Sequence, residues 1–227
     1  MPATIVARSE SAFTIQVEIP YGSSMLHAEE AIQQRLNEAG TLATGEVLQR
    51  FDTDGSPIQV GDTKLTSKGK LLKEYQTPYG VAPVERHVYQ SSRGGKTYCP
   101  LDRNARIVVS STPRFARMVS HKYAEFGSAR VIKDLAENHG RQVARCFVQG
   151  VADAVAAVAM AKEEDWEYAL PDLEAPPATV TIGMDGTCLL MGEGGWRETM
   201  VGTIGFYDRD GQRRHTVYLA AKEGCDL

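Results

Sequence analysis

Ala178–Met191, with the sequence ATVTIGMDGTCLLM, is the stretch that decides the fold of the C-terminal part of the chain. It is rich in β-branched and apolar residues and follows a proline-rich break, a pattern that predicts a β-strand. Alternate residues of a strand point to opposite faces, so Val180, Ile182 and Met184 share one face and Asp185 lies on the other. A lone carboxylate is costly to bury unless it is paired, hydrogen-bonded or bound to a metal. Asp185 is therefore either a strand-end residue before a glycine turn or a functional acid.

Two further strands are predicted after this one. Trp196–Tyr207 follows a glycine-rich break at 192–195, and Gln212–Ala221 follows the turn sequence Asp-Arg-Asp-Gly at 208–211. Three strands joined by short glycine turns predict an antiparallel meander whose first strand carries the acid. This order resembles the way in which ribonuclease-H-like nucleases begin.

Several long words of the sequence carry a resemblance to a known family. In chain order they are TPRFARMVSHKYAEFGSARVIKDLAENHGRQVAR (112–145), GMDGTCLLM (183–191), GWRETMVGTIGFYDRDG (195–211) and RHTVYLAA (214–221). From about Phe51 to Ala221 the chain resembles the Kra-type insertion-sequence transposases, a DDE family. The resemblance implies that Asp185 is a catalytic residue, the first acid of a DDE triad that binds Mg²⁺ or Mn²⁺. It also implies double-stranded DNA, at the ends of an insertion sequence, as the partner.

The other two acids of such a triad are not found by the same comparison. Members of the family continue with a second Asp and a final Glu on later elements, whereas this chain stops at Leu227. Two-metal phosphoryl transfer needs several convergent carboxylates. The acids that follow Asp185 match neither motif: Glu193, Glu198, Asp208, Asp210, Glu223 and Asp226. We therefore expect an incomplete catalytic domain that does not bind the metal tightly by itself, and whether the chain is an enzyme stays open at this point.

Composition places the chain among soluble globular proteins. Its 227 residues are 42% hydrophobic and 24% charged, and its net charge is -4. No signal-peptide pattern opens the sequence, and the longest apolar run, Ala154–Ala161, is too short to cross a membrane. The four cysteines, Cys99, Cys146, Cys188 and Cys225, form no CxxC pair, which argues against a disulfide framework. The expected location is the cytoplasm, with no membrane partner.

The charge is distributed unevenly along the chain. The segment from Lys64 to Arg145 contains 16 Lys and Arg against 6 Asp and Glu, a net charge of +10, so the remainder carries -14. A cationic segment between acidic ones is typical of a phosphate-binding region.

The basic segment ends in a helical pattern. Thr112 and Pro113 predict the start of a helix that runs to about 126, a second short helix follows from 128 to 137, and the turn Asn-His-Gly at 138–140 leads into a long helix from 141 to about 168. A short helix, a turn with glycine and a helix with exposed Arg and Gln are the arrangement of a helix-turn-helix DNA reader. Spacing alone fits equally a helix pair that merely packs, but the basic charge and the resemblance favour DNA. The predicted DNA-binding residues are Arg141, Gln142, Arg145, Gln149 and Lys133, because Arg suits guanine and Gln suits adenine in the major groove.

The later part of the long helix is crowded with alanines between Ala152 and Ala161. Small residues permit a partner helix to approach closely, so this segment predicts a homodimer contact or packing against its own domain. A second open point is the pair His87 and Cys99, which could form half of a zinc site on a hairpin, although tetrahedral zinc needs four ligands.

The pattern as a whole predicts an α+β protein with four parts. These are a small α/β cap (1–45), a β-hairpin-rich basic region (46–110), a helix-turn-helix DNA-binding domain (111–169), and the start of an incomplete ribonuclease-H-like catalytic domain (178–227) made of its first three antiparallel strands. We expect a transposase-derived protein that recognises insertion-sequence ends for DNA transposition. The alternatives are a truncated transposase that represses transposition by occupying those ends, and an inactive relic.

Overall fold

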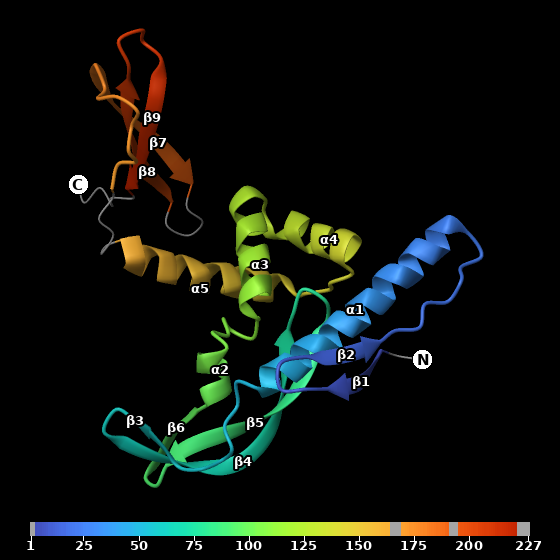
Figure 1. Cartoon of the computed structure of the whole chain (residues 1–227). Coiled ribbons are helices and arrows are strands. Elements are labelled where there is room, and N and C mark those ends of the chain that lie inside the picture. Colours follow the sequence, from blue (N-terminus) through green and yellow to red (C-terminus); the bar gives the residue numbers. More distant parts are fainter. Residues whose placement is uncertain (1–2, 164–168, 191–194, 222–227) are drawn as a thin grey trace. The chain divides into compact units, whose positions relative to one another are not determined.

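The computed structural model describes residues 3–163, 169–190 and 195–221 (Figure 1). Over these residues it contains five helices and three antiparallel sheets, which confirms the α+β class. The chain divides into two compact units, Met1–Trp166 and Glu167–Leu227. All five helices and two of the sheets belong to the first unit, and the third sheet belongs to the second.

The first unit begins with a hairpin and a long helix. Strands β1 (Thr4–Arg8) and β2 (Phe13–Gln16) pair antiparallel, and α1 spans Met25–Gln49. The side chain of Ser24 caps α1 by accepting a hydrogen bond from the backbone N–H of His27.

The sequence pattern predicts a helix from about Ser24 to Ala39 with Gly40 as its stop, and α1 is longer. The predicted stop at Gly40 is wrong, and so the expected boundary at residue 45 falls inside the helix. Gly40 serves packing instead: a Cβ atom there would lie 2.4 Å from the Tyr79 ring. The glycine thus lets the β4–β5 turn approach the helix backbone, which is a reason for glycine that no local signal distinguishes from a helix end.

The second sheet has four strands in the order β3-β4-β5-β6. They are β3 (Ile58–Val60), β4 (Thr63–Gln76), β5 (Val81–Ser91) and β6 (Gly94–Tyr98). Alternate residues of β5 are buried, and Val84 packs with Leu48 of α1 and Tyr75 of β4. Helix α2 (Pro100–Asn104) closes this core with Leu101, which is fully buried.

Three helices follow: α3 (Pro113–Glu125), α4 (Ser128–His139) and α5 (Arg145–Glu163). The first two agree with the predicted helices. Helix α5 begins at Arg145 rather than at 141, and its predicted end near 168 lies outside the described residues. The three helices share a core of fully buried side chains, namely Phe115, Val119, Val131, Leu135, Val148 and Val151.

The second unit holds the predicted meander. Strands β7 (Thr179–Leu190), β8 (Trp196–Tyr207) and β9 (Arg213–Ala221) pair antiparallel in the order β7-β8-β9. The register sets Ile182 opposite Ile204, and Ile204 opposite Val217, so one face of the sheet is apolar. On this face Ile182 is 75% and Met184 is 74% exposed.

This exposed sheet should open more readily than the sheet of the first unit. We expect the amide protons of β8, the central strand of its sheet, to exchange with solvent faster than those of β5, the central strand of the other. The reason is that β5 buries side chains against α1 and α2, whereas the apolar face around β8 stays largely wet. Native-state hydrogen exchange read by mass spectrometry checks this, and equal protection of both strands would contradict it.

Candidate nucleic-acid interface

The connection between α4 and α5 consists of residues 140–144 and begins at Gly140. This residue ends α4 in the left-handed conformation (φ 61°), and its N–H donates to the carbonyls of Ala136 and Leu135. A left-handed residue after the last helical turn is the usual place for glycine, because a side chain there would be strained. The predicted end of α4 at Gly140 is therefore confirmed, whereas the predicted tight turn directly into a helix at 141 is wrong.

The apolar faces of α4 and α5 pack into the protein, so their polar faces point to the solvent. Leu135 of α4 and Val148 of α5 are fully buried in the shared core, and the rings of Phe115 and Phe147 stack with centroids 6.2 Å apart. An ion pair joins α3 to α4, since Lys122 Nζ lies 2.5 Å from Asp134 Oδ2. Hydrogen bonding to Lys122 holds the pKa of the Asp134 carboxyl below its usual range.

Arg141 was expected to contact DNA, and its place in the structure contradicts this. The side chain is only 5% exposed and lies within the protein. Its Nε donates to the backbone carbonyl of Thr77 at 3.0 Å, and Nη2 donates to Gln76 Oε1 at 2.6 Å. Its guanidinium also lies over the ring of Phe115, 5.3 Å from the centroid.

The burial of Arg141 explains why α5 starts late. Residues 140–144 follow an irregular path that carries the Arg141 side chain toward the end of β4, and helical backbone resumes only at Arg145. Burial lowers the pKa of Arg141. The residue thus fastens the α4–α5 turn to the β4–β5 hairpin and drops out of the candidate interface.

The other four predicted residues remain at the surface. Gln142, Arg145 and Lys133 are exposed, and Gln149, one turn after Arg145 on α5, is half-buried. Arg145 borders a hollow of about 280 Å³ beside the start of α4, and Arg130 of α4 borders the same hollow. The structure therefore brings the beginnings of α4 and α5 together around two arginines.

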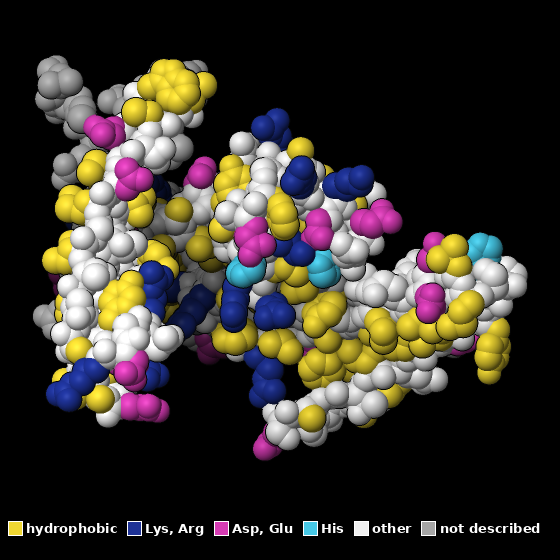
Figure 2. Space-filling view, turned by 90° about the horizontal axis from the view of Figure 1, so that it is seen from above, with side chains coloured by type: hydrophobic (Ala, Val, Ile, Leu, Met, Phe, Trp, Pro, Cys, Tyr) yellow, Lys and Arg dark blue, Asp and Glu magenta, His cyan; other side chains and the backbone are white. Residues whose placement is uncertain are grey.

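Further cations on these helices were not singled out from the sequence. Arg114 and Arg117 are exposed on α3 and line another small surface hollow with His121 and Lys122. Several Lys and Arg side chains lie over the helical part of the surface in Figure 2. Counting charge along the chain located this region, but only the helix packing tells which cations face outward.

Asp185 lies near the middle of β7, opposite Val201 of β8, and it is exposed. The alternation of the strand sets Asp185 on the face opposite to the apolar one. Glu198 pairs with Cys188, an odd number of residues away, so it belongs to the other face. Asp208 is engaged in the β8–β9 turn, where hydrogen bonds from the Gln212 and Asp210 backbones and from Arg214 lower its pKa.

These placements do not make a metal site around Asp185. Within the described part of the chain, no group of three or more His, Cys, Asp or Glu side chains is arranged to hold an ion. Glu193, Glu223 and Asp226 lie outside the described residues. A single exposed carboxylate does not fit the divalent cation that the resemblance implies, so we assign no chemical step to it.

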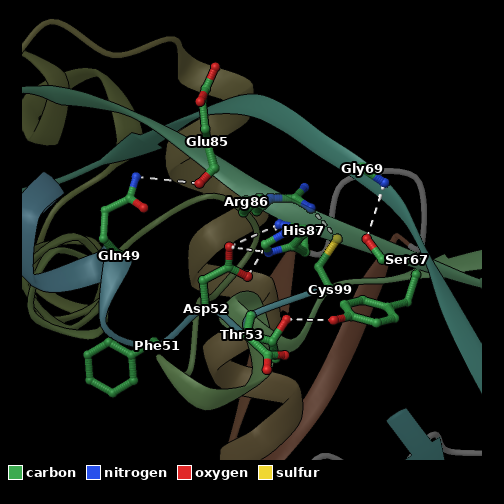
Figure 3. Close-up of polar contacts among 12 residues, drawn as sticks. Gln49, Phe51, Asp52, Thr53, Ser67, Gly69, Glu85, Arg86, His87 and Cys99 are labelled. Carbon is green, nitrogen blue, oxygen red and sulfur yellow. Dashed lines mark hydrogen bonds and ion pairs between the residues drawn. The ribbon is translucent and has the colours of Figure 1, made fainter. Parts of the chain in front are cut away.

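A second polar cluster joins the loop after α1 to β5 (Figure 3). The Asp52 carboxylate accepts hydrogen bonds from the His87 backbone N–H, at 3.0 and 3.2 Å, and its Oδ2 lies 3.0 Å from His87 Nδ1. A carboxylate only accepts, so the ring proton belongs on Nδ1. The loop passes close to the other ring nitrogen, because a Cβ on Gly55 would lie 2.9 Å from it. The two side chains are largely buried, and the pair is a clamp between these segments.

Cys99 belongs to a separate contact. Its thiol lies against the guanidinium of Arg86, which is 3.6 Å from the Asp102 carboxylate, and Asp102 accepts a hydrogen bond from the Tyr75 hydroxyl. Burial raises the pKa of the Cys99 thiol. His87 and Cys99 thus have other partners, and the structure gives no support to half a zinc site.

The C-terminal half of α5 extends beyond the shared core. Ala156, Ala157 and Ala159 are exposed there, as are Val158 (59%) and Met160 (65%). Packing inside its own domain accounts for the first part of the alanine-rich segment, where Ala152 is buried and Val155 packs against the shared core.

No described helix has the length and apolar character needed to span a membrane. In the comparisons with known proteins, the sequence matches no protein-family model and has no significant match among curated proteins.

Proposed function

We propose that this chain is a transposase-derived protein that binds double-stranded DNA at the ends of an insertion sequence, with α4 and α5 as its helix-turn-helix. The observation that carries the proposal is the exposed Arg145 in the first turn of α5, with the exposed Gln142 in the connection that precedes the helix. Both helices turn their apolar faces into one core, so this polar end is free for a ligand.

The residue types suit the major groove. A recognition helix contacts bases with the side chains of its first turns, and Arg145, with Gln142 before it and Gln149 one turn later, has that position on α5. Arg donates two hydrogen bonds to guanine, and Gln pairs with adenine. We assign base contact to these three residues.

Phosphate contact is assigned to the cations around them. Lys133 is exposed on α4, and Arg130 borders the same hollow as Arg145. Salt-dependent contacts of this kind set the register of a protein on the duplex but carry no sequence information.

For the second unit, we propose that β7, β8 and β9 are the opening strands of a ribonuclease-H-like catalytic domain, with Asp185 as its first acid. Its exposed place on β7 fits that role, and Mg²⁺ or Mn²⁺ would be the metal in such a domain. The function that we propose for this chain is DNA binding, and we derive no cleavage step from Asp185. The second candidate function is a regulator that occupies the element's ends without cutting them.

Two further assignments belong to this proposal. The exposed small residues of the later α5 would allow a second copy to pack there, and a homodimer suits the reading of paired half-sites. A cytoplasmic location is in keeping with scattered cysteines, of which Cys99, Cys146 and Cys188 are free.

The proposal is tested by Arg145→Ala. A duplex bound by the parent chain is first selected from a random-sequence library, and affinities for that duplex and a scrambled one are measured by fluorescence anisotropy at fixed salt. We expect Arg145→Ala to weaken binding to the selected duplex about 5- to 150-fold, equivalent to 1–3 kcal/mol for a lost base contact, with a much smaller effect on the scrambled one.

Lys162→Ala is the matched control, because Lys162 is an exposed cation in the last turn of the same helix. It should bind both duplexes as the parent does. If selection enriches no sequence, or if Arg145→Ala keeps the parent's preference for the selected duplex, the helix-turn-helix assignment is wrong.

A further inference from the structure

One end of the four-stranded sheet is strongly basic, and it lies outside the helices assigned to DNA above. We call it the sheet tip. It consists of the β4 bulge and the β5–β6 turn and carries five exposed cations: Lys64, Lys68, Lys70, Arg93 and Lys96.

Strand register gathers these cations on a small area. On β4, Lys68 lies in a bulge between Ser67, which pairs with Tyr89, and Lys70, which pairs with His87. On the other side of β5, the β6 register pairs Tyr98 with the same Tyr89. Lys68 is therefore level with about Val88, and Lys96, two residues before Tyr98, is level with about Gln90, so the two cations flank neighbouring residues of β5 from strands that lie two spacings, or about 10 Å, apart.

The remaining two cations complete the tip. Arg93 belongs to the turn closed by the pair Ser91 and Gly94, and Lys64 lies two residues before Thr66, which pairs with Gln90. Lys64 is thus level with the β5–β6 turn. The cations come from two strands and a turn, so the sheet sets their spacing.

This charge is not neutralised by the protein. None of the five cations forms an ion pair among the described residues. Three carboxylates lie near this end: Asp62, in the β3–β4 turn, Asp54, and Asp52, which accepts hydrogen bonds from His87, the β5 partner of Lys70. The Asp54 oxygens accept hydrogen bonds from the Ser56 N–H at 2.9 Å and the Ser56 hydroxyl at 3.0 Å. Five cations against three carboxylates leave a positive field that attracts an anion.

The backbone of the tip is shaped for close approach. Gly69, Gly94 and Gly95 have φ values of +100°, +79° and +96°, and the positions where their Cβ atoms would be have no neighbour within 4 Å. Residues with side chains rarely adopt this conformation, so the glycines are required by the bulge and the turn. They also leave open space beside the backbone between the cations, so that a phosphate group can approach it closely.

The chemistry of the tip favours nucleic acid over a lipid surface. Surfaces that bind anionic membranes combine cations with apolar side chains that insert between the lipids. Residues 61–70 and 91–98 include no exposed large hydrophobic side chain, and the exposed Leu71 and Leu72 follow beyond Lys70 on β4. A protein surface that contacts the charged backbone of a nucleic acid needs no such side chain.

We propose that the sheet tip is a second nucleic-acid contact, which binds the sugar–phosphate backbone through Lys68, Arg93 and Lys96 without reading sequence. It extends the DNA-binding function proposed for α4 and α5, but it acts through different residues. The tip supplies affinity that depends on salt, and the helices supply the choice of sequence.

The test is the triple variant Lys68→Ala, Arg93→Ala, Lys96→Ala in the full chain. Binding to the selected and the scrambled duplex is measured between 50 and 200 mM NaCl, conditions that we choose because counterion release dominates in this range. Each lost phosphate contact lowers the slope of log K against log salt by about 0.9, so three should lower its magnitude by about 2.7. At 50 mM NaCl we expect the alanine variant to bind each duplex at least about tenfold more weakly than the parent does. The factor should be the same for both duplexes.

The control is the charge-keeping triple variant Lys68→Arg, Arg93→Lys, Lys96→Arg, which should retain the parent's slope. Thermal unfolding followed by circular dichroism verifies that both variants fold like the parent. An unchanged slope in the alanine variant overturns the proposal, as does a loss restricted to the selected duplex. In a further outcome, the parent binds phosphatidylserine vesicles, the alanine variant does not, and both bind the duplexes equally. That result would make the tip a membrane contact and would also overturn the proposal.

Failure of the helix-turn-helix assignment gives a different result. In that case the parent prefers no sequence, whereas the alanine variant of the tip still lowers the salt slope on the scrambled duplex.

Discussion

Arg141→Met should lower the free energy of unfolding of the Met1–Trp166 unit by about 2–4 kcal/mol. The substitution keeps most of the apolar stem but removes the guanidinium, which leaves the carbonyl of Thr77 and the amide oxygen of Gln76 without their donor. Hydrogen bonds to a charged group contribute about 1.5–3 kcal/mol each, and a buried acceptor without a partner adds a desolvation penalty. Loss of the contact with the Phe115 ring acts in the same direction.

Urea unfolding followed by circular dichroism at 222 nm measures this effect, because all the described helices belong to that unit. Arg114→Met is the control: Arg114 is exposed on α3, so its replacement should change stability by less than about 0.5 kcal/mol. Under conditions where Arg141→Met is fully folded, it should keep the parent's preference for the selected duplex. Parent-like stability together with a lost preference would return Arg141 to the interface.

The comparison of Arg141 with Arg145 shows what the sequence can predict about the interface. Apolar residues at helical spacing and the Asn-His-Gly turn were enough to place α4 and α5. They could not separate two arginines four residues apart, because the difference is made by Thr77, which lies 64 residues earlier in the chain. A contact of that range leaves no trace in local periodicity, so the buried cation was taken for an exposed one.

Glycines set a similar limit on the rest of the fold. Gly40 has the appearance of a helix stop, yet α1 continues through it because the Tyr79 ring needs the space. Gly69 interrupts the alternation of β4, a strand of 14 residues that the sequence did not predict as a unit. A glycine's role depends on what approaches it, and that is decided by tertiary packing.

The meander was predictable because each of its strands carries its own alternating pattern and its own turn residues. The pairing β7-β8-β9 and the two faces follow from that pattern alone. The surroundings of Asp185 do not, since they depend on which side chains of neighbouring strands share its face. The strand register shows that Glu198 of β8 lies on the opposite face of the sheet, so it cannot act together with Asp185 as a second carboxylate.

The Asp52–His87 clamp makes the second large prediction. We expect Asp52→Ala to lower the stability of the first unit by about 3 kcal/mol, because the Asp52 side chain is only 5% and the His87 side chain only 13% exposed. The substitution leaves the His87 backbone N–H and ring N–H without an acceptor in a place that water hardly reaches, and unsatisfied buried donors cost about 1–3 kcal/mol each. Urea unfolding followed at 222 nm gives the value.

The clamp differs from a catalytic His–Asp pair in what its loss should change. Asp54→Ala is the matched control in the same loop: the Asp54 carboxylate bonds only to Ser56, two residues away, so its removal should cost well under 1 kcal/mol. Asp52→Asn keeps the size and one acceptor oxygen, and should recover part of the lost stability. If Asp52→Ala has the same urea midpoint of unfolding as the parent, the Asp52–His87 pair does not hold the loop to β5. The expected loss instead makes this cluster the joint by which the chain after α1 is fixed to β5, beside the sheet tip that we propose to contact DNA.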